Sequence, residues 1–201
     1  MNALPAPAPT VAADSRRRQL LEIALTVFAR HGYRKASMDD VAQAAEVSRQ
    51  GLYLHFPTKE DLFRETVRHA LHRSQAAVDE ALADTTAALE DRLVRAFDAW
   101  IGQFVEAVGA DVGDLVDACR TLLGPTVDHE KRRFAQRVGA ELDASGLAAV
   151  YARRGLTSAD LAATLCATAE GLRLAHNSRQ AFVDGMRVAV RALCVPLEDP
   201  A

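Results

Sequence analysis

Side chains that can bind a nucleic acid gather in one short stretch, VSRQGLYLHFPTKED, at residues 47 to 61. Arginine and glutamine can form paired hydrogen bonds with guanine and adenine, and Arg49 and Gln50 are neighbours here. A tyrosine hydroxyl, an imidazole and a lysine ammonium can each reach a phosphate oxygen, and one of each follows in the same stretch. These residue types favour a surface that meets both base edges and phosphates.

Two short helices are predicted to position this surface. Ser37 is a good N-cap for the first helix, and Asp40 stands three residues later in the capping-box position. The helical pattern then breaks at AEVS, and Ser48 caps a second helix that Pro57 ends. Two short helices joined by a tight turn form a helix-turn-helix, whose second helix lies in the DNA major groove.

Spacing predicts which face of the second helix is free. Leu52 and Phe56 are four residues apart, so both lie on the side that packs on the core. Arg49, Gln50 and Tyr53 then share the opposite, outer face. An outer face of this composition is predicted to meet a DNA duplex.

The charge distribution points the same way. The chain of 201 residues has a net charge of −3, with 24 Lys or Arg against 27 Asp or Glu. Residues 1–75 nevertheless hold eleven of the basic residues and eight of the acidic ones, so the N-terminal part is basic and the remainder is acidic. A basic N-terminal part suggests that this part meets a polyanion.

Residues 20 to 63, LLEIALTVFARHGYRKASMDDVAQAAEVSRQGLYLHFPTKEDLF, resemble the DNA-binding domain of the TetR family of transcriptional regulators. The resemblance rests on the Leu-Leu…Ala…Phe…Gly-Tyr run, on Ser-x-x-Asp-Val-Ala, and on Val-Ser…Leu-Tyr-x-His-Phe-x-x-Lys-Glu. It implies base contacts by the arginine and glutamine and phosphate contacts by the residues that follow. The predicted DNA-binding residues are Arg17, Ser37, Ser48, Arg49, Gln50, Gly51, Tyr53, His55 and Lys59. Arg17 is among them because three arginines at 16–18 crowd the start of the first helix, where the helix dipole disfavours cations and an external anion would favour them.

Two positions depart from the family pattern. Glu46 stands in the turn where the family usually has glycine, and it would cost about 1 kcal/mol if the backbone there is left-handed. Gly51 stands where the family more often has threonine, which removes one potential contact to DNA. Neither change breaks the motif, but the turn is expected to be slightly reshaped.

The whole chain is predicted to be all-α, because alanine, leucine, arginine and glutamate dominate it and no alternating β-branched run occurs. We expect a disordered Ala/Pro-rich tail at 1–13, a helix-turn-helix DNA-binding domain at 14–58, and a helical ligand-binding and dimerisation domain at 59–195. Helices in the second domain are expected at about 59–84, 87–108, 114–123, 126–153, 157–176 and 180–193, with Gly124-Pro125 ending the third of them. The segment at 126–153 is expected as one helix or a pair, because Gly139 and Gly146 weaken it.

The last helix is apolar almost all round, so a two-fold partner is the simplest cover for it. A four-helix interface built from the last two helices of each chain is also what the resemblance implies. The predicted interface residues are Leu161, Leu165, Phe182, Met186 and Val190. Dimerisation would let two recognition helices read a palindromic operator, about 34–36 Å apart.

The resemblance further implies a pocket for a small-molecule effector between the middle helices. Its candidate lining residues are Trp100, Phe104, Phe134 and Tyr151, each of which is also an ordinary core residue type. No cofactor and no metal is predicted, because the histidines at 69 and 72 lack a third ligand.

The leading hypothesis is therefore a ligand-responsive dimeric repressor released from its operator by a small molecule. The alternative is a DNA-bound adaptor that recruits a protein partner without a small-molecule ligand. An enzyme is not predicted, since no nucleophile motif or glycine-rich phosphate loop organises the polar residues. No apolar run is long enough to span a membrane and the three cysteines form no CxxC pair, so a cytoplasmic protein is expected.

Overall fold

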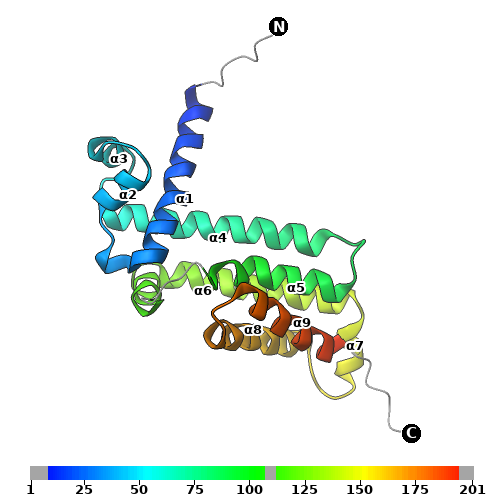
Figure 1. Ribbon diagram of the computed structural model, residues 1–201. Coiled ribbons are helices and arrows are strands. Elements are labelled where there is room, and N and C mark those ends of the chain that lie inside the picture. Colours follow the sequence, from blue (N-terminus) through cyan, green and yellow to red (C-terminus); the bar gives the residue numbers. More distant parts are fainter. Residues whose placement is uncertain (1–8, 107–111, 195–201) are drawn as a thin grey trace. The chain divides into compact units, whose positions relative to one another are not determined.

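The computed structural model describes residues 9–106 and 112–194, and within these residues it contains helices and no strand, which confirms the all-α prediction. Figure 1 shows the helices in chain order. They are α1 (Pro9–Lys35), α2 (Met38–Ala44), α3 (Arg49–His55), α4 (Lys59–Ala83), α5 (Leu89–Trp100), the 3₁₀ turn η1 (Gly102–Phe104), α6 (Val112–Ala144), α7 (Leu147–Ala152), α8 (Ser158–Ala175) and α9 (Arg179–Cys194).

The described chain folds into two compact units. The first contains the described residues up to 71 together with those of 108–124, and the second contains those of 72–107 and those from 125 onward. The first unit is therefore larger than the predicted domain at 14–58, because the start of α4 and the start of α6 fold with it. Of the predicted tail at 1–13, residues 1–8 lie outside the described residues, while α1 already begins at Pro9.

The core of the first unit is built on α1. Leu20, Ala24 and Phe28 recur at helical spacing and are almost fully buried. The ring of Phe28 meets the edge of Phe63 from α4, with ring centroids 5.1 Å apart. Gly32 breaks the helical path at φ 76° and ψ 169°, which a residue with a side chain rarely adopts, so α1 is kinked at this glycine.

The turn between α2 and α3 is a Schellman motif, which fixes how the second helix leaves the first. The amide of Val47 donates to the carbonyl of Ala42 at 3.0 Å, and the amide of Glu46 donates to Gln43 at 3.2 Å. Glu46 occupies the left-handed position of this motif, with φ 53°. The left-handed backbone considered for Glu46 is therefore present, while the turn keeps the regular hydrogen bonds of the motif and is not reshaped.

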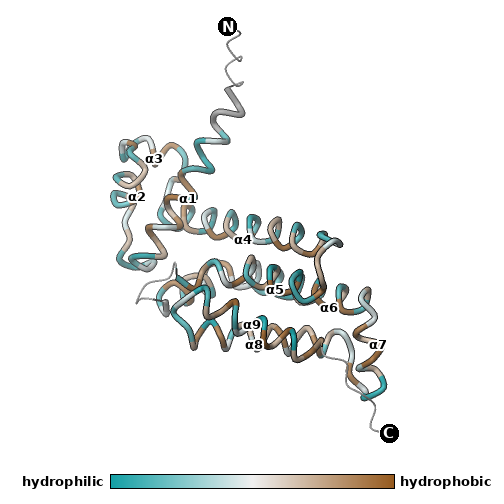
Figure 2. Tube along the Cα trace, turned by 45° about the vertical axis from the view of Figure 1, so that its right-hand side comes forward, coloured by the Kyte–Doolittle hydropathy of each residue, from teal (hydrophilic) through white to brown (hydrophobic). Residues whose placement is uncertain are grey.

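The second unit has an apolar core between α5, α6, α8 and α9. Phe97 from α5 and Phe134 from α6 meet edge to face at 5.0 Å between centroids, and Phe182 and Met186 from α9 are fully buried. Figure 2 shows brown and teal segments alternating along α4 and α5, as expected for helices with one apolar side.

A polar network joins α6 to the second half of α4 within this unit. The buried side chain of Gln75 donates to Glu130 at 2.9 Å and accepts from Arg137 at 2.9 Å. Arg137 also pairs with Asp79. Because buried polar groups are costly unless paired, this network fixes the register between the two helices.

Two predicted boundaries in the second half were wrong. Gly124-Pro125 does not end a helix, since α6 runs through Pro125. The φ angle that proline imposes is compatible with a helix, at the cost of one hydrogen bond and of crowding between the ring and the carbonyl four residues earlier. The helix predicted at 87–108 ends at Trp100, because Ile101 adopts φ −121°. The segment at 126–153, predicted as one helix or a pair, is a pair: it is divided at Gly146, which adopts φ 79°.

Candidate nucleic-acid interface

The third helix presents one polar face to solvent. The Ser48 hydroxyl begins it by accepting the Gly51 amide at 3.0 Å, and the buried Leu52 and Phe56 anchor its inner side. On the other side Arg49 and Gln50 are exposed, and Tyr53 is 37% exposed. The sequence spacing thus gives an outer face made of groups that donate and accept hydrogen bonds.

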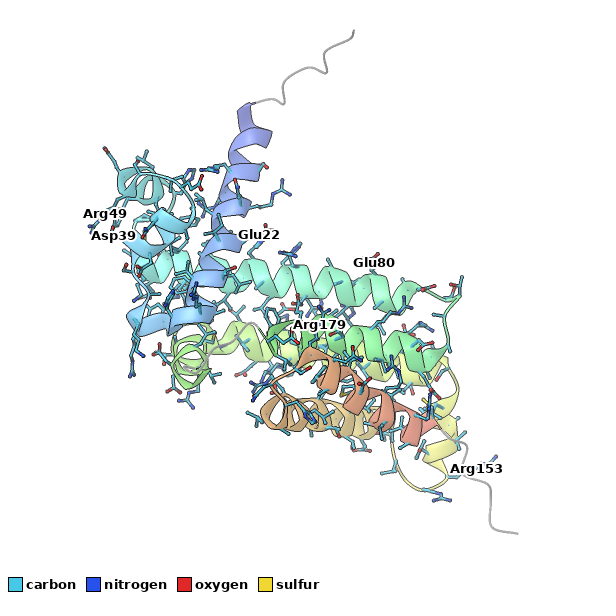
Figure 3. All side chains as sticks on the ribbon, in the orientation of Figure 1. Glu22, Asp39, Arg49, Glu80, Arg153 and Arg179 are labelled. Carbon is cyan, nitrogen blue, oxygen red and sulfur yellow. The ribbon has the colours of Figure 1, made fainter. Side chains whose placement is uncertain are left out.

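Arg49 is held in place by an aspartate from the second helix. Its Nη1 lies 3.0 Å from Oδ2 of Asp39, and both side chains are more than half exposed. Figure 3 labels the two residues side by side, on α2 and α3. The guanidinium also lies 5.6 Å from the ring centre of Tyr53, and interactions with Tyr53 and then with Asp39 raise the pKa of Arg49.

Asp39 is a residue that the sequence reasoning missed. Two adjacent aspartates follow Ser37, and Asp40 forms the capping box with that serine. The neighbouring Asp39 is exposed and makes no cap, so its spare charge was the signal that could have found it.

Arg17 fastens α1 to the end of α3. Its Nη1 donates to the carbonyl of His55 at 2.9 Å, and its guanidinium lies 4.4 Å from the centre of the Phe56 ring. A weaker pairing with Glu65 spans 3.7 Å. These contacts orient the third helix on the core, and the side chain still remains 38% exposed.

Lys59 is directed toward its own chain. Its ammonium donates to the carbonyl of Arg34 at 3.1 Å and lies 4.6 Å above the ring of Tyr33. Burial lowers the pKa of Lys59, while Asp114 and Asp40 act in the opposite direction. Asp114, from the first turn of α6, accepts the Arg34 amide at 2.7 Å and pairs with its guanidinium at 3.2 Å.

Comparison with known proteins identifies this arrangement. The model of the bacterial regulatory proteins of the tetR family matches residues 20–66, which span the core of α1, all of α2 and α3, and the start of α4. The chain belongs to the TetR family.

Curated relatives of this TetR-family protein are similar over the same region. The chain is 43% identical to the HTH-type transcriptional regulator LuxR of Vibrio harveyi over 58 residues, which is 29% of this chain and 28% of LuxR. It is 42% identical to the HTH-type transcriptional repressor KstR2 of Rhodococcus jostii over 65 residues, 32% of each chain. The matches span about a third or less of each relative.

Solved structures share the fold over almost the whole length. A TetR-family transcriptional regulator from Agrobacterium tumefaciens superposes with a TM-score of 0.64 at 19% identity, covering 89% of this chain and 97% of that one. The fatty acid degradation regulator FadR from Bacillus halodurans gives 0.66 at 16% identity, covering 98% and 100%. At these identities the similarity concerns the fold alone.

The nine predicted DNA-binding residues of this TetR-family protein do not all lie on one surface. Those on the outer face of α3 lie together, while Ser37 and Ser48 act as helix caps. A Cβ at Gly51 would lie 3.1 Å from the Ser48 hydroxyl, so a larger residue would crowd that cap. Contact of these residues with DNA stays a prediction.

The predicted pocket residues of this TetR-family protein separate into two groups. Trp100 and Phe134 stack at 5.1 Å and line a cavity of about 200 Å³, whose lining also includes the pair formed by Lys131 and Glu170 at 3.1 Å. Phe104 and Tyr151 do not line this cavity; the hydroxyl of Tyr151 instead donates to the carbonyl of residue 193 at 2.8 Å.

The five residues predicted for the dimer interface of this TetR-family protein face its own core. Leu161 is 4% exposed and Leu165 2%, while Phe182, Met186 and Val190 are fully buried. That assignment was therefore wrong, because an apolar pattern all round a helix does not reveal which side its own chain covers. The exposed side of the same helices carries Leu174 and Val188, at 74% and 70% exposure.

Among the described residues, no group of three or more His, Cys, Asp or Glu side chains is arranged to hold a metal ion. None of their helices is long and apolar enough to cross a membrane.

Proposed function

We propose that this chain is a dimeric transcriptional repressor, acting in the cytoplasm, that binds a palindromic operator in double-stranded DNA and is released by a small molecule. The observation that carries the proposal is the third helix, which buries Leu52 and Phe56 and leaves Arg49, Gln50 and Tyr53 on one open face. A helix of this kind fits the major groove with its N-terminal residues against base edges.

The side chains of that face divide by chemistry. Arg49 suits the O6 and N7 acceptors of guanine, and Gln50 suits the N6 and N7 groups of adenine. Tyr53 and His55 stand further along the helix, where a hydroxyl and an imidazole can bond phosphates. Lys59 donates to its own chain and contributes charge at the start of α4 rather than a free ammonium.

A second copy is proposed to bind through the exposed side of α8 and α9. On α8 the exposed positions at helical spacing are Ala163, Ala167, Gly171 and Leu174. On α9 the exposed apolar positions are Val188 and Ala192, whereas Gly185 packs against Leu172 of α8 in the same chain. Small side chains at this spacing let helices approach closely, and the two large apolar groups gain a partner.

The cavity beside Trp100 is proposed to hold the effector. Its apolar wall and the charged pair in its lining fit the usual composition of a ligand site, although its volume of about 200 Å³ allows only a small molecule. A coupling of about 1–3 kcal/mol between this cavity and DNA binding would suffice for release. Trp100 is the single tryptophan of the chain, so its fluorescence would report ligand entry directly.

The test is to select bound duplexes from a random DNA pool with the full chain, then compare variants on the enriched site. Arg49→Ala should weaken that site by about 1–3 kcal/mol and relax its base preference. Arg120→Ala is the matched control, since this exposed arginine has its own aspartate partner at 2.7 Å. If both variants behave like the parent, the third helix does not read DNA.

Effector response is tested separately. Small molecules that quench Trp100 fluorescence should also lower the affinity for the selected site. If quenching molecules leave DNA affinity unchanged and a protein partner binds the DNA-bound chain, the adaptor function replaces release by a small molecule.

A further inference from the structure

One side chain on the outer face of the third helix has no role in the contacts described above. Leu54 is 82% exposed, the highest value among the exposed large hydrophobic residues of the described chain. It stands two positions after the fully buried Leu52, which turns it to the opposite side of the helix, away from the core.

Its surroundings are the polar groups of the proposed DNA-reading face. Gln50, one helical turn before it, is exposed, and Tyr53 precedes it directly. Apart from Tyr53, the other exposed large hydrophobic residues lie at position 116 or beyond. Leu54 is therefore a single apolar group within a polar face, and no other apolar side chain on that face forms a patch with it.

The base edges of the major groove offer one conspicuous apolar partner. Adenine, guanine and cytosine present hydrogen-bonding groups there, whereas thymine adds a methyl group that apolar side chains contact. An exposed leucine on a base-facing surface thus matches one base by its chemistry. The Cβ atoms of residues four apart on a helix are about 5–6 Å from each other, which corresponds to one or two steps of about 3.4 Å along the duplex.

We propose that Leu54 is a specificity-determining residue that selects a thymine, within one or two base pairs of the pair read by Gln50, by contact with its methyl group. This inference rests on the proposed DNA-binding function and adds a base preference that the polar residues do not supply.

Replacing thymine by deoxyuridine tests this directly, because it removes the methyl group and keeps base pairing. Each thymine in one half of the selected site is replaced in turn, and dissociation constants are measured by fluorescence anisotropy with the full chain at fixed salt. Loss of one methyl contact corresponds to roughly a fourfold weakening. One replacement should weaken the parent by about that factor and should leave Leu54→Ala changed by less than about twofold.

Two controls separate methyl contact from general damage. Gln50→Ala removes the neighbouring polar contact and should keep the response to deoxyuridine. Leu156→Ala removes an exposed leucine outside the third helix, which is 40% exposed, and should behave as the parent does. Since Leu54 is exposed and alanine favours helices, the Leu54→Ala variant is expected to fold.

Each remaining outcome counts against the proposal in a distinct way. If no single deoxyuridine weakens the parent, or if one weakens Leu54→Ala equally, another group or none reads the methyl and the role of Leu54 is overturned. If the random pool yields no enriched sequence at all, the DNA-reading function fails first, and the proposal for Leu54 fails with it.

Discussion

Replacing Glu46 by glycine should stabilise this protein. Glu46 has φ 53° in the Schellman turn that joins α2 to α3, a conformation that costs a residue with a side chain about 1–2 kcal/mol. Glycine removes this cost but gains freedom in the unfolded chain, which offsets about 0.4–1 kcal/mol. The expected net gain in the free energy of unfolding is therefore about 0.5–1 kcal/mol, or roughly 1–4 °C in Tm for a chain of this size.

The measurement is urea unfolding followed by circular dichroism, at one protein concentration, with thermal unfolding alongside. Glu46→Ala is the decisive comparison, because it removes the same charge and side chain but retains the left-handed strain. Glu46→Asn should fall between them, since asparagine tolerates this conformation better than most residues. Gln43→Gly, at an exposed position inside α2, should instead destabilise the protein by about 1 kcal/mol.

The order of the free energies of unfolding of the Glu46 variants tests the argument. Backbone strain at the turn is supported if the glycine variant is more stable than the asparagine variant, and the asparagine variant more stable than the alanine variant. If the alanine variant gains as much as the glycine variant, loss of the glutamate charge explains the effect and the argument from backbone strain is refuted. Affinity for the selected DNA site should stay within about twofold in Glu46→Gly, because glycine keeps the turn that places the third helix.

Three further outcomes are expected. Asp39→Asn should strengthen binding to random DNA and lower the ratio of specific to random affinity. The reason is that this change removes an anion near the phosphates and frees Arg49 from its ion pair. Measuring both affinities over a range of salt concentrations checks this. The pair of changes Leu174→Glu and Val188→Glu should shift sedimentation toward a monomer at micromolar concentration, and an unchanged dimer would exclude that face. Burial raises the pKa of Cys166 to about 11, so its thiol stays neutral until the pH approaches that value. At pH 8 the folded protein should therefore carry about a hundredfold less thiolate at Cys166 than at an ordinary cysteine. Alkylation of Cys166, mapped by mass spectrometry, should be correspondingly slow in the folded protein and should accelerate on unfolding.

Local signals predicted the first unit well. The capping box of Ser37 and Asp40, the cap at Ser48 and the i, i+4 spacing of Leu52 and Phe56 are each decided within one or two turns, and the structure contains all of them. The same reasoning singled out Glu46 as costly if its backbone is left-handed, because a missing glycine in a tight turn is a local feature, and the structure has that backbone.

Contacts between separate helices could not be predicted from the local sequence pattern. The pairing of Arg49 with Asp39 and the burial of Lys59 on Arg34 depend on how separate helices pack, which spacing does not encode. The side of α9 that its own chain covers was misassigned for the same reason, since Phe182 could equally have faced a partner on pattern alone.

The contacts that Lys59 and Asp114 make with Arg34 have a practical consequence for exchanging DNA-binding domains between regulators. Its carbonyl is held by Lys59 and its amide by Asp114, a residue 80 positions further along the chain. A fragment cut after α4 would lack that carboxylate and would lose both its hydrogen bond to the Arg34 amide and its ion pair with the Arg34 guanidinium. The smallest DNA-binding unit that can be transferred is therefore discontinuous in sequence. Grafts that include the first turns of α6 should fold more faithfully than grafts that omit them.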